Sequence, residues 1–257
     1  MNRGTIYVAG YPKSGNTWLT RLLADVLNCP AGGCRPEDDH HEPATEGLDR
    51  LSDYVVRKGH FRLVGSDGGK VVPTEHRLAW RNITDEKVVL IYRDPRDVIL
   101  SGADYWRVSW REQLDRVCLG KESMRLHGSW AEYMREWMNS EPSFNFASVS
   151  YEDLMEDPVK QIILILISFD MSVPQGDQIR AAVERQSFAR RKAWTRKHGD
   201  NLTFGDKKFH LHLMKKGRLG EWKQVFDAAA CAAAEHYLGP EMRALGYTKE
   251  AQWWKNL

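Results

Sequence analysis

A glycine-containing loop near the N-terminus has the composition of a phosphate-binding site. Residues 10–18 read GYPKSGNTW, with Gly10 and Gly15 on either side of Lys13. A buried strand is expected directly before this loop and a helix directly after it. Glycine permits the backbone turns that such a loop needs, and the first turn of the helix presents unpaired N–H groups to an anion. The loop is therefore predicted to hold a phosphate group.

The position of the lysine separates this loop from that of an ordinary nucleoside triphosphatase. The spacing GxxxxGxT matches a nucleotide-binding loop, but Asn16 stands where a lysine normally follows the second glycine, and Lys13 lies inside the loop. In those enzymes the lysine contacts the β and γ phosphates, and the next Ser or Thr binds magnesium. The displaced lysine therefore favours a different phosphate-containing ligand.

A second group of anion-binding side chains follows the apolar segment at residues 87–92. Arg93 comes directly after this segment, and Ser101 lies two helical turns further on. A guanidinium and a hydroxyl at this place can bind one phosphate together. The alternative is an arginine at the end of a strand and an unrelated helical serine. Near the C-terminus, residues 215–217 read KKG, which alone indicates a basic loop.

His60 is the preferred candidate for a base among nine histidines. Imidazole, with an unperturbed pKa of about 6.5, accepts a proton at neutral pH. An isolated histidine is more often structural, but His60 follows Lys58 on a predicted strand that faces the phosphate loop. The segment DDHHE at residues 38–42 lacks the fixed spacing of a metal site, and we predict no metal. The weaker candidates, in a late basic segment, are His198, His210 and His212.

Alternating strands and helices must position these groups. Strands are predicted at residues 5–9, 54–58, 87–92 and 145–150, and helices at 17–27, after Arg93, and at 151–168, 176–196, 222–238 and 240–245. Residues 29–52 and 197–220 lack periodicity and are predicted as loops. This order predicts an α/β fold in which helices flank a P-loop-like parallel sheet of about four to five strands. We expect one domain over residues 1–257, with ligands at the carboxyl ends of the strands.

The bulk composition excludes several classes of protein. The 37 Lys and Arg residues nearly balance the 35 Asp and Glu residues, which argues against nonspecific binding to nucleic acid or to an anionic membrane. No apolar segment reaches the roughly 20 residues that cross a bilayer, and the N-terminus lacks the pattern of a signal peptide. The four cysteines are scattered without a CxxC pair, which fits a reducing cytosol. We therefore expect a cytoplasmic protein.

Three segments together resemble the cytosolic sulfotransferases, which use 3′-phosphoadenosine 5′-phosphosulfate (PAPS). Residues 11–18, YPKSGNTW, are similar to the family's 5′-phosphosulfate loop, commonly YPKSGTTW, with Asn16 as the one departure. The segment RDPRDVILS at 93–101 resembles the family's 3′-phosphate site. Residues 215–223, KKGRLGEWK, resemble its RKGxxGxWK segment, with Lys215 in place of an arginine. The segments occur in the family's order, and the resemblance spans most of the chain.

The resemblance implies a role for each candidate residue. His60 would remove the proton of the acceptor, Lys58 would lie near the sulfuryl group, and Lys13 would neutralise the leaving phosphate. Gly59 stands where the family has threonine, and Gln186 also departs from a threonine. The residues implied for PAPS are Lys13, Ser14, Gly15, Asn16, Thr17 and Trp18 in the loop, Arg93, Ser101, Lys215, Lys216 and Gly217 at the 3′-phosphate, and Tyr151, Ser187 and Phe188 at the adenine. PAP, the desulfated nucleotide, would be the product, without a metal.

The implied reaction is transfer of a sulfuryl group from PAPS to a hydroxyl or amine of a small-molecule acceptor. One alternative is a P-loop kinase or nucleoside triphosphatase, which needs an acidic magnesium ligand that Asp94 poorly provides. The other is a noncatalytic nucleotide-binding protein, which has no need of Lys58 and His60. The acceptor stays unidentified. The candidate walls of its pocket are residues 29–52, Tyr105, Trp106, Trp110 and the late basic segment 197–220, although Trp106 on a helix more often packs on its own domain. The family's dimerisation motif has no clear match, which leaves the oligomeric state open.

Overall fold

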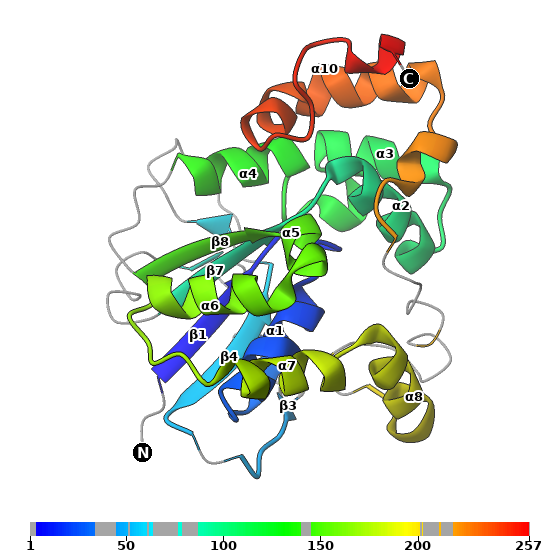
Figure 1. The fold of residues 1–257 in the computed structure, drawn as a ribbon. Coiled ribbons are helices and arrows are strands. Elements are labelled where there is room, and N and C mark those ends of the chain that lie inside the picture. Colours follow the sequence, from blue (N-terminus) through cyan, green and yellow to red (C-terminus); the bar gives the residue numbers. More distant parts are fainter. Residues whose placement is uncertain are drawn as a thin grey trace.

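A six-stranded sheet forms the centre of the structure (Figure 1). The computed structural model describes residues 4–33, 45–50, 52–60, 62–63, 77–78, 87–139, 145–200, 202, 211 and 218–256. The sheet, in spatial order, consists of β3 (Thr45–Glu46), β2 (Ala31–Gly33), β4 (Tyr54–Gly59), β1 (Gly4–Ala9), β7 (Lys87–Tyr92) and β8 (Asn145–Ser150). Five neighbouring strands are parallel, and β3 pairs with β2 in the antiparallel direction. A separate parallel pair joins β5 (Arg62–Leu63) and β6 (Arg77–Leu78).

The predicted parallel sheet is confirmed, and all four predicted strands belong to it. The prediction of residues 29–52 as an irregular loop is wrong in part, because β2 and β3 lie within this range. The sequence of β2, Ala-Gly-Gly, has little intrinsic strand preference. It is a strand because its backbone pairs with β4, where Ala31 lies opposite Val56.

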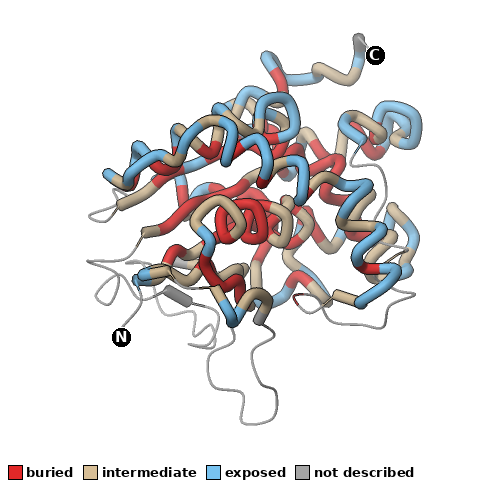
Figure 2. Tube along the Cα trace, turned by 60° about the horizontal axis from the view of Figure 1, so that its bottom comes forward, coloured by how far each residue is buried: buried red, intermediate tan, exposed pale blue. Residues whose placement is uncertain are grey.

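Helices cover both faces of the sheet (Figure 1). One face carries α2 (Pro95–Trp106), α3 (Trp110–Leu119), α4 (Trp130–Met138) and α10 (Ala228–Ala244), and the other α1 (Asn16–Val26), α6 (Pro158–Ser168) and α7 (Gly176–Arg185). Side chains of β7 alternate between the two layers: Val88 and Leu90 join the first core cluster, and Val89 and Ile91 the second. Figure 2 shows the buried residues concentrated between these layers.

Two predicted helices are each divided into two in the structure. The predicted helix 151–168 divides at Asp157 into α5 (Tyr151–Glu156) and α6, because Pro158 begins a new helix and the Asp157 side chain accepts from the N–H of Lys160. The predicted helix 176–196 divides at Gln186 and Ser187 into α7 and α8 (Phe188–His198). Ser187 adopts an extended conformation that starts the second helix.

Near the C-terminus, one helix replaces two that were predicted separately. The segments 222–238 and 240–245 were predicted as separate helices, but α10 continues through Pro240. Proline removes one N–H from the helix, yet Leu238 and Met242 on either side are fully buried in the core and hold the helix together. A short 3-10 helix, Glu221–Gln224, precedes α10. No helix among the described residues combines the length and the apolar composition needed to cross a bilayer.

Candidate active site

Four segments that are distant in sequence meet at the carboxyl edge of the sheet. The phosphate loop follows β1, His60 follows β4, Arg93 follows β7 and Tyr151 follows β8. Because β1 lies between β4 and β7, with Ala9 opposite both Gly59 and Leu90, these segments are neighbours. The strand order therefore assembles one site.

The phosphate loop keeps its shape through its two glycines. Gly15 caps α1 with φ of 104°, and a Cβ there would lie 2.6 Å from Cδ2 of Tyr151. A Cβ on Gly10 would lie 2.5 Å from the carbonyl oxygen of Ile91. The fully buried hydroxyl of Ser14 has no hydrogen-bond partner among the described residues. A buried hydroxyl beside the N-terminus of α1 fits a loop that holds an oxyanion.

Lys13 and Lys58 give this edge its positive charge. The Nζ atom of Lys13 lies 4.1 Å from the centre of the Tyr105 ring, and Nζ of Lys58 donates to Oγ1 of Thr17 over 3.0 Å. Burial, followed by the charges of Lys58 and Arg93, lowers the pKa of Lys13 to about 7. Burial, followed by the charge of Arg21, lowers the pKa of Lys58 to about 8. An anion at this edge would relieve the repulsion between these cations.

Arg93 connects the phosphate loop with the C-terminal segment. Its guanidinium donates to the carbonyl of Lys13 over 3.4 Å and to that of Arg218 over 3.3 Å, and stacks 4.5 Å from the centre of the Tyr151 ring. Its Nε atom is buried and has no partner among the described residues. Ser101 lies half-buried on α2. Long hydrogen bonds and a spare N–H leave the guanidinium able to bind an anion.

His60 has a defined hydrogen bond at one ring nitrogen. Its Nδ1 atom lies 2.8 Å from the carbonyl oxygen of Gly10, and because a carbonyl can only accept, Nδ1 carries the proton. Nε2 is then the atom with a free lone pair. Burial, followed by the charge of His127, lowers the pKa of His60 to about 3, so the ring is neutral at physiological pH. A neutral imidazole with an open Nε2 can act as a base.

His127 is a neighbour that sequence reasoning missed. Its ring centre lies 5.4 Å from that of His60 in an edge-on arrangement. It precedes α4 in a segment without a recognisable motif. The packing of α4 over the sheet brings it to His60.

Two of the residues predicted at the adenine contact each other. Trp18 and Tyr151 contact each other edge-on, with ring centres 5.9 Å apart. Phe188 is 39% exposed, and Ser187 precedes α8 without a side-chain cap bond. Gln186, which departs from the family's threonine, donates to Asp25 over 2.7 Å. Several positions lie outside the described residues: Lys215, Lys216 and Gly217, predicted at the 3′-phosphate, the weaker candidates His210 and His212, and His40 and His41 of the segment rejected as a metal site.

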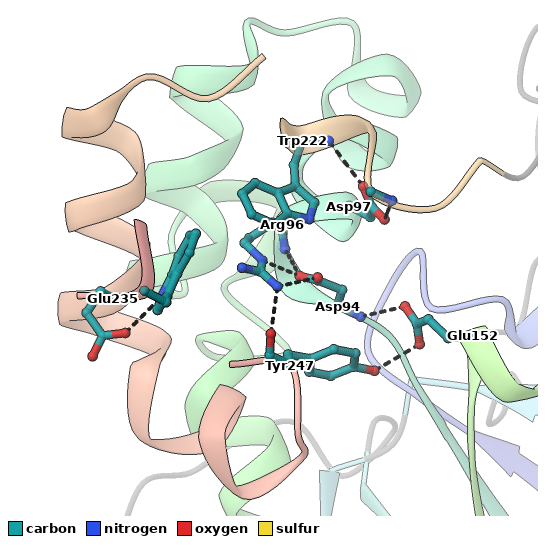
Figure 3. A network of polar contacts seen from close by, with 9 residues as sticks. Asp94, Arg96, Asp97, Glu152, Trp222, Glu235 and Tyr247 are labelled. Carbon is teal, nitrogen blue, oxygen red and sulfur yellow. Dashed lines mark hydrogen bonds and ion pairs between the residues drawn. The ribbon is translucent and has the colours of Figure 1, made fainter. Parts of the chain in front are cut away.

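Asp97, in the first turn of α2, binds the backbone of residues 220–222 (Figure 3). Its carboxylate accepts from the N–H of Gly220 over 2.7 Å and of Trp222 over 3.4 Å. Arg96 pairs with Asp94 and packs its guanidinium 3.8 Å from the centre of the Trp222 ring. Sequence reasoning gave neither Arg96 nor Asp97 a role, because charged side chains in the first turn of a helix are common. The contacts place residues 218–222 beside Arg93.

A buried group of ion pairs lies close to Lys58. Arg21 of α1 pairs with Glu46 over 2.7 Å and with Asp200 over 2.6 Å. The side chains of Arg21 and Asp200 are 6% and 3% exposed. This group links α1 to β3 and to the end of α8. In the described part of the chain, no cluster of three His, Cys, Asp or Glu side chains is placed to hold a metal ion.

Comparisons with known proteins identify a family for this chain. A family model described as "Sulfotransferase domain" matches residues 3–246. Curated relatives include sulfotransferase 2A1 of Macaca fascicularis, 23% identical over 93% of this chain and 85% of the relative, and sulfotransferase 2A1 of Homo sapiens, 28% identical over 87% and 79%.

Two solved structures have a similar fold. Mouse sulfotransferase SULT7A1 complexed with PAP has a TM-score of 0.68 at 19% identity, covering 93% of this chain and 84% of its own. Retinol dehydratase in a complex with retinol and PAP has a TM-score of 0.61 at 17% identity, covering 95% and 82%. The match over nearly the whole sequence shows that this chain belongs to the sulfotransferase family.

Proposed function

We propose that this protein transfers a sulfuryl group from PAPS to a hydroxyl or amine of a small-molecule acceptor, leaving PAP. The observation that carries the proposal is the convergence of Lys13, Lys58 and Arg93 on a phosphate loop beside a neutral His60. Two similar solved structures contain PAP, and one of them also contains retinol. Family membership and the chemistry of the site therefore support the same donor.

The donor is assigned to two anion sites. The loop residues Lys13 to Thr17 and the N-terminus of α1 suit the 5′-phosphosulfate, because they combine backbone N–H groups with a cation. Arg93 suits the 3′-phosphate, with Ser101 and the segment 215–217 assigned there by resemblance. Trp18 and Tyr151 suit the adenine, with Ser187 and Phe188 at its edge.

Each side chain has a distinct part in the transfer. PAPS supplies the sulfuryl group. His60 accepts the proton of the acceptor at Nε2 while the acceptor oxygen or nitrogen forms its bond to sulfur. Lys13 neutralises the charge that develops on the phosphate oxygen as the sulfur–oxygen bond breaks, and Lys58 steadies the sulfuryl oxygens. An in-line geometry lets these groups act on opposite sides of the sulfur.

Two measurements test the proposal. Calorimetric titration should give tight binding of PAP and none of ATP with magnesium; micromolar binding of ATP alone would overturn the donor assignment. Labelled PAPS incubated with a panel of phenols, alcohols and amines should give a labelled product. The His60→Ala variant should lose at least about 10² in kcat with PAP affinity retained. His236→Ala, at an exposed position of α10, is the matched control, and an unimpaired His60→Ala enzyme would overturn the base.

A further inference from the structure

The side chain of Asn16 joins the carboxyl ends of two strands. Its Nδ2 atom donates to the carbonyl of Gly10, after β1, over 3.0 Å, and to that of Gly59, the last residue of β4, over 3.1 Å. Asn16 is 4% exposed. The orientation of the amide is fixed by these partners, because two carbonyl oxygens require the donor end of the side chain. A loop residue thus ties the phosphate loop to the strand that carries Lys58 and His60.

The carbonyl of Gly10 is shared between Asn16 and His60. It accepts from Nδ2 of Asn16 over 3.0 Å and lies 2.8 Å from Nδ1 of His60. A carbonyl oxygen has two lone pairs and can serve both donors. Nδ2 of Asn16 also lies 3.5 Å from Nδ1 of His60, and because both atoms carry hydrogen in this tautomer, the two side chains share the carbonyl without bonding to each other. Asn16 therefore fixes the acceptor to which the imidazole is hydrogen-bonded.

The chemistry of position 16 suits asparagine and no smaller side chain. In the resembling family motif this position is threonine, whose hydroxyl has one O–H and can donate to one carbonyl at a time. Position 59, where the family has another threonine, is glycine here. Asn16 donates to the backbone carbonyl of Gly59, which a residue of any type at position 59 would present.

The opposite end of the Asn16 amide is its carbonyl oxygen. The Oδ1 atom of Asn16 is buried and has no partner among the described residues. Burying an unpaired acceptor is unfavourable, and such exceptions concentrate at functional sites. The two hydrogen bonds that Nδ2 donates to Gly10 and Gly59 therefore have to offset the cost of burying Oδ1.

We propose that Asn16 is a positioning residue for the base His60. Its amide holds the Gly10 carbonyl and the end of β4 so that His60 keeps the proton on Nδ1 and presents Nε2 to the acceptor. The inference rests on the proposed function, in which His60 is the base. It differs from the PAPS-binding role expected from sequence, because the side chain is directed to backbone carbonyls.

Nitrogen NMR of histidine-labelled protein tests this directly, because two-bond couplings distinguish the two tautomers. In the wild-type protein the His60 signals, identified by their loss in His60→Gln, should show the proton on Nδ1 at neutral pH. Asn16→Leu keeps the size of the side chain without its donors, and Asn16→Thr keeps one donor. In both, the His60 signals should become a mixture of tautomers. Asn139→Ala, at an exposed position after α4, is the matched control.

The kcat and the Kd for PAP of the Asn16 variants supply a second readout. A misplaced base should lower kcat by about 10-fold to 10²-fold, while the Kd for PAP stays unchanged because the loop N–H groups remain. Wild-type His60 with its proton on Nε2 would overturn the inference even if no variant folds. Normal kcat and tautomer in Asn16→Thr, alongside an inactive His60→Ala, would overturn it and leave the proposed function standing. Activity retained by His60→Ala would instead overturn the proposed base, whatever Asn16 does.

Discussion

Binding of PAP is predicted to weaken as the pH rises above 7, chiefly because Lys13 loses its proton. Burial lowers the pKa of Lys13 to about 7 and that of Lys58 to about 8 in the protein without donor. A bound phosphate favours the charged lysines, so binding takes up protons whenever these side chains start neutral. Affinity should therefore be full below the pKa values of the free protein and fall above them.

The size of the effect follows from the two pKa values. Between pH 7.0 and 8.5 the protonated fraction of a group with a pKa of 7 falls from about 0.5 to about 0.03, or about 16-fold. For a group with a pKa of 8 it falls from about 0.9 to about 0.24, or about 4-fold. If the complex keeps both protons, the Kd for PAP should rise by roughly 60-fold over this range. The second phosphate pKa of PAP, near 6, lies below this window and leaves the ligand charge nearly constant.

Calorimetry at constant ionic strength measures this dependence, and two buffers of different ionisation enthalpy measure the proton uptake. Lys13→Gln should keep only the roughly 4-fold dependence, and Lys58→Gln the roughly 16-fold one. Lys121→Gln, at an exposed position before the short helix Glu122–Met124, should behave as wild type. A Kd for PAP that is constant between pH 7.0 and 8.5, or proton release on binding, would refute the reasoning.

Three further substitutions test the framework of the site. Gly15→Ala places a Cβ against Tyr151 on a residue with φ of 104°, so we expect the free energy of unfolding to fall by about 1–2 kcal/mol from the backbone conformation alone. In calorimetric melting its melting temperature should fall further than that of Gly199→Ala, where φ is 86° but no atom lies within 4 Å of the added Cβ. Asp97→Ala leaves the N–H groups of Gly220 and Trp222 without their acceptor, so the free energy of unfolding in urea should fall by about 1–3 kcal/mol and PAP should bind more weakly. An unchanged Kd for PAP would mean that this contact does not contribute to the donor site. Arg21→Met removes a buried cation from Glu46 and Asp200 and should cost about 3–5 kcal/mol, so a wild-type urea midpoint would contradict the ion-pair geometry.

Local features of the sequence were sufficient to predict the elements that carry the site. Gly10 and Gly15 around Lys13 indicated a phosphate loop because only a few residue types allow such turns before a helix. The apolar segment 87–92 and the Asp-Pro start of α2 indicated a buried strand and a helix start for similar reasons, since side-chain alternation and capping act within a few residues. These patterns depend on neighbours in the chain, which a sequence displays directly.

The order of the strands and the partners of the buried polar groups were decided by the tertiary structure. Parallel strands do not reveal their neighbours, so the placement of β4 beside β1, which puts His60 next to Gly10, could not be read from either segment alone. The contact of His60 with His127 and the hold of Asp97 on Gly220 likewise join residues far apart in sequence. Such contacts form only when the whole chain packs, because the free energy that fixes them comes from burial on both faces of the sheet. The sequence by itself therefore determined the phosphate loop, four of the six strands of the sheet and the first turns of α1 and α2, and the packing of the complete chain decided which groups meet around them.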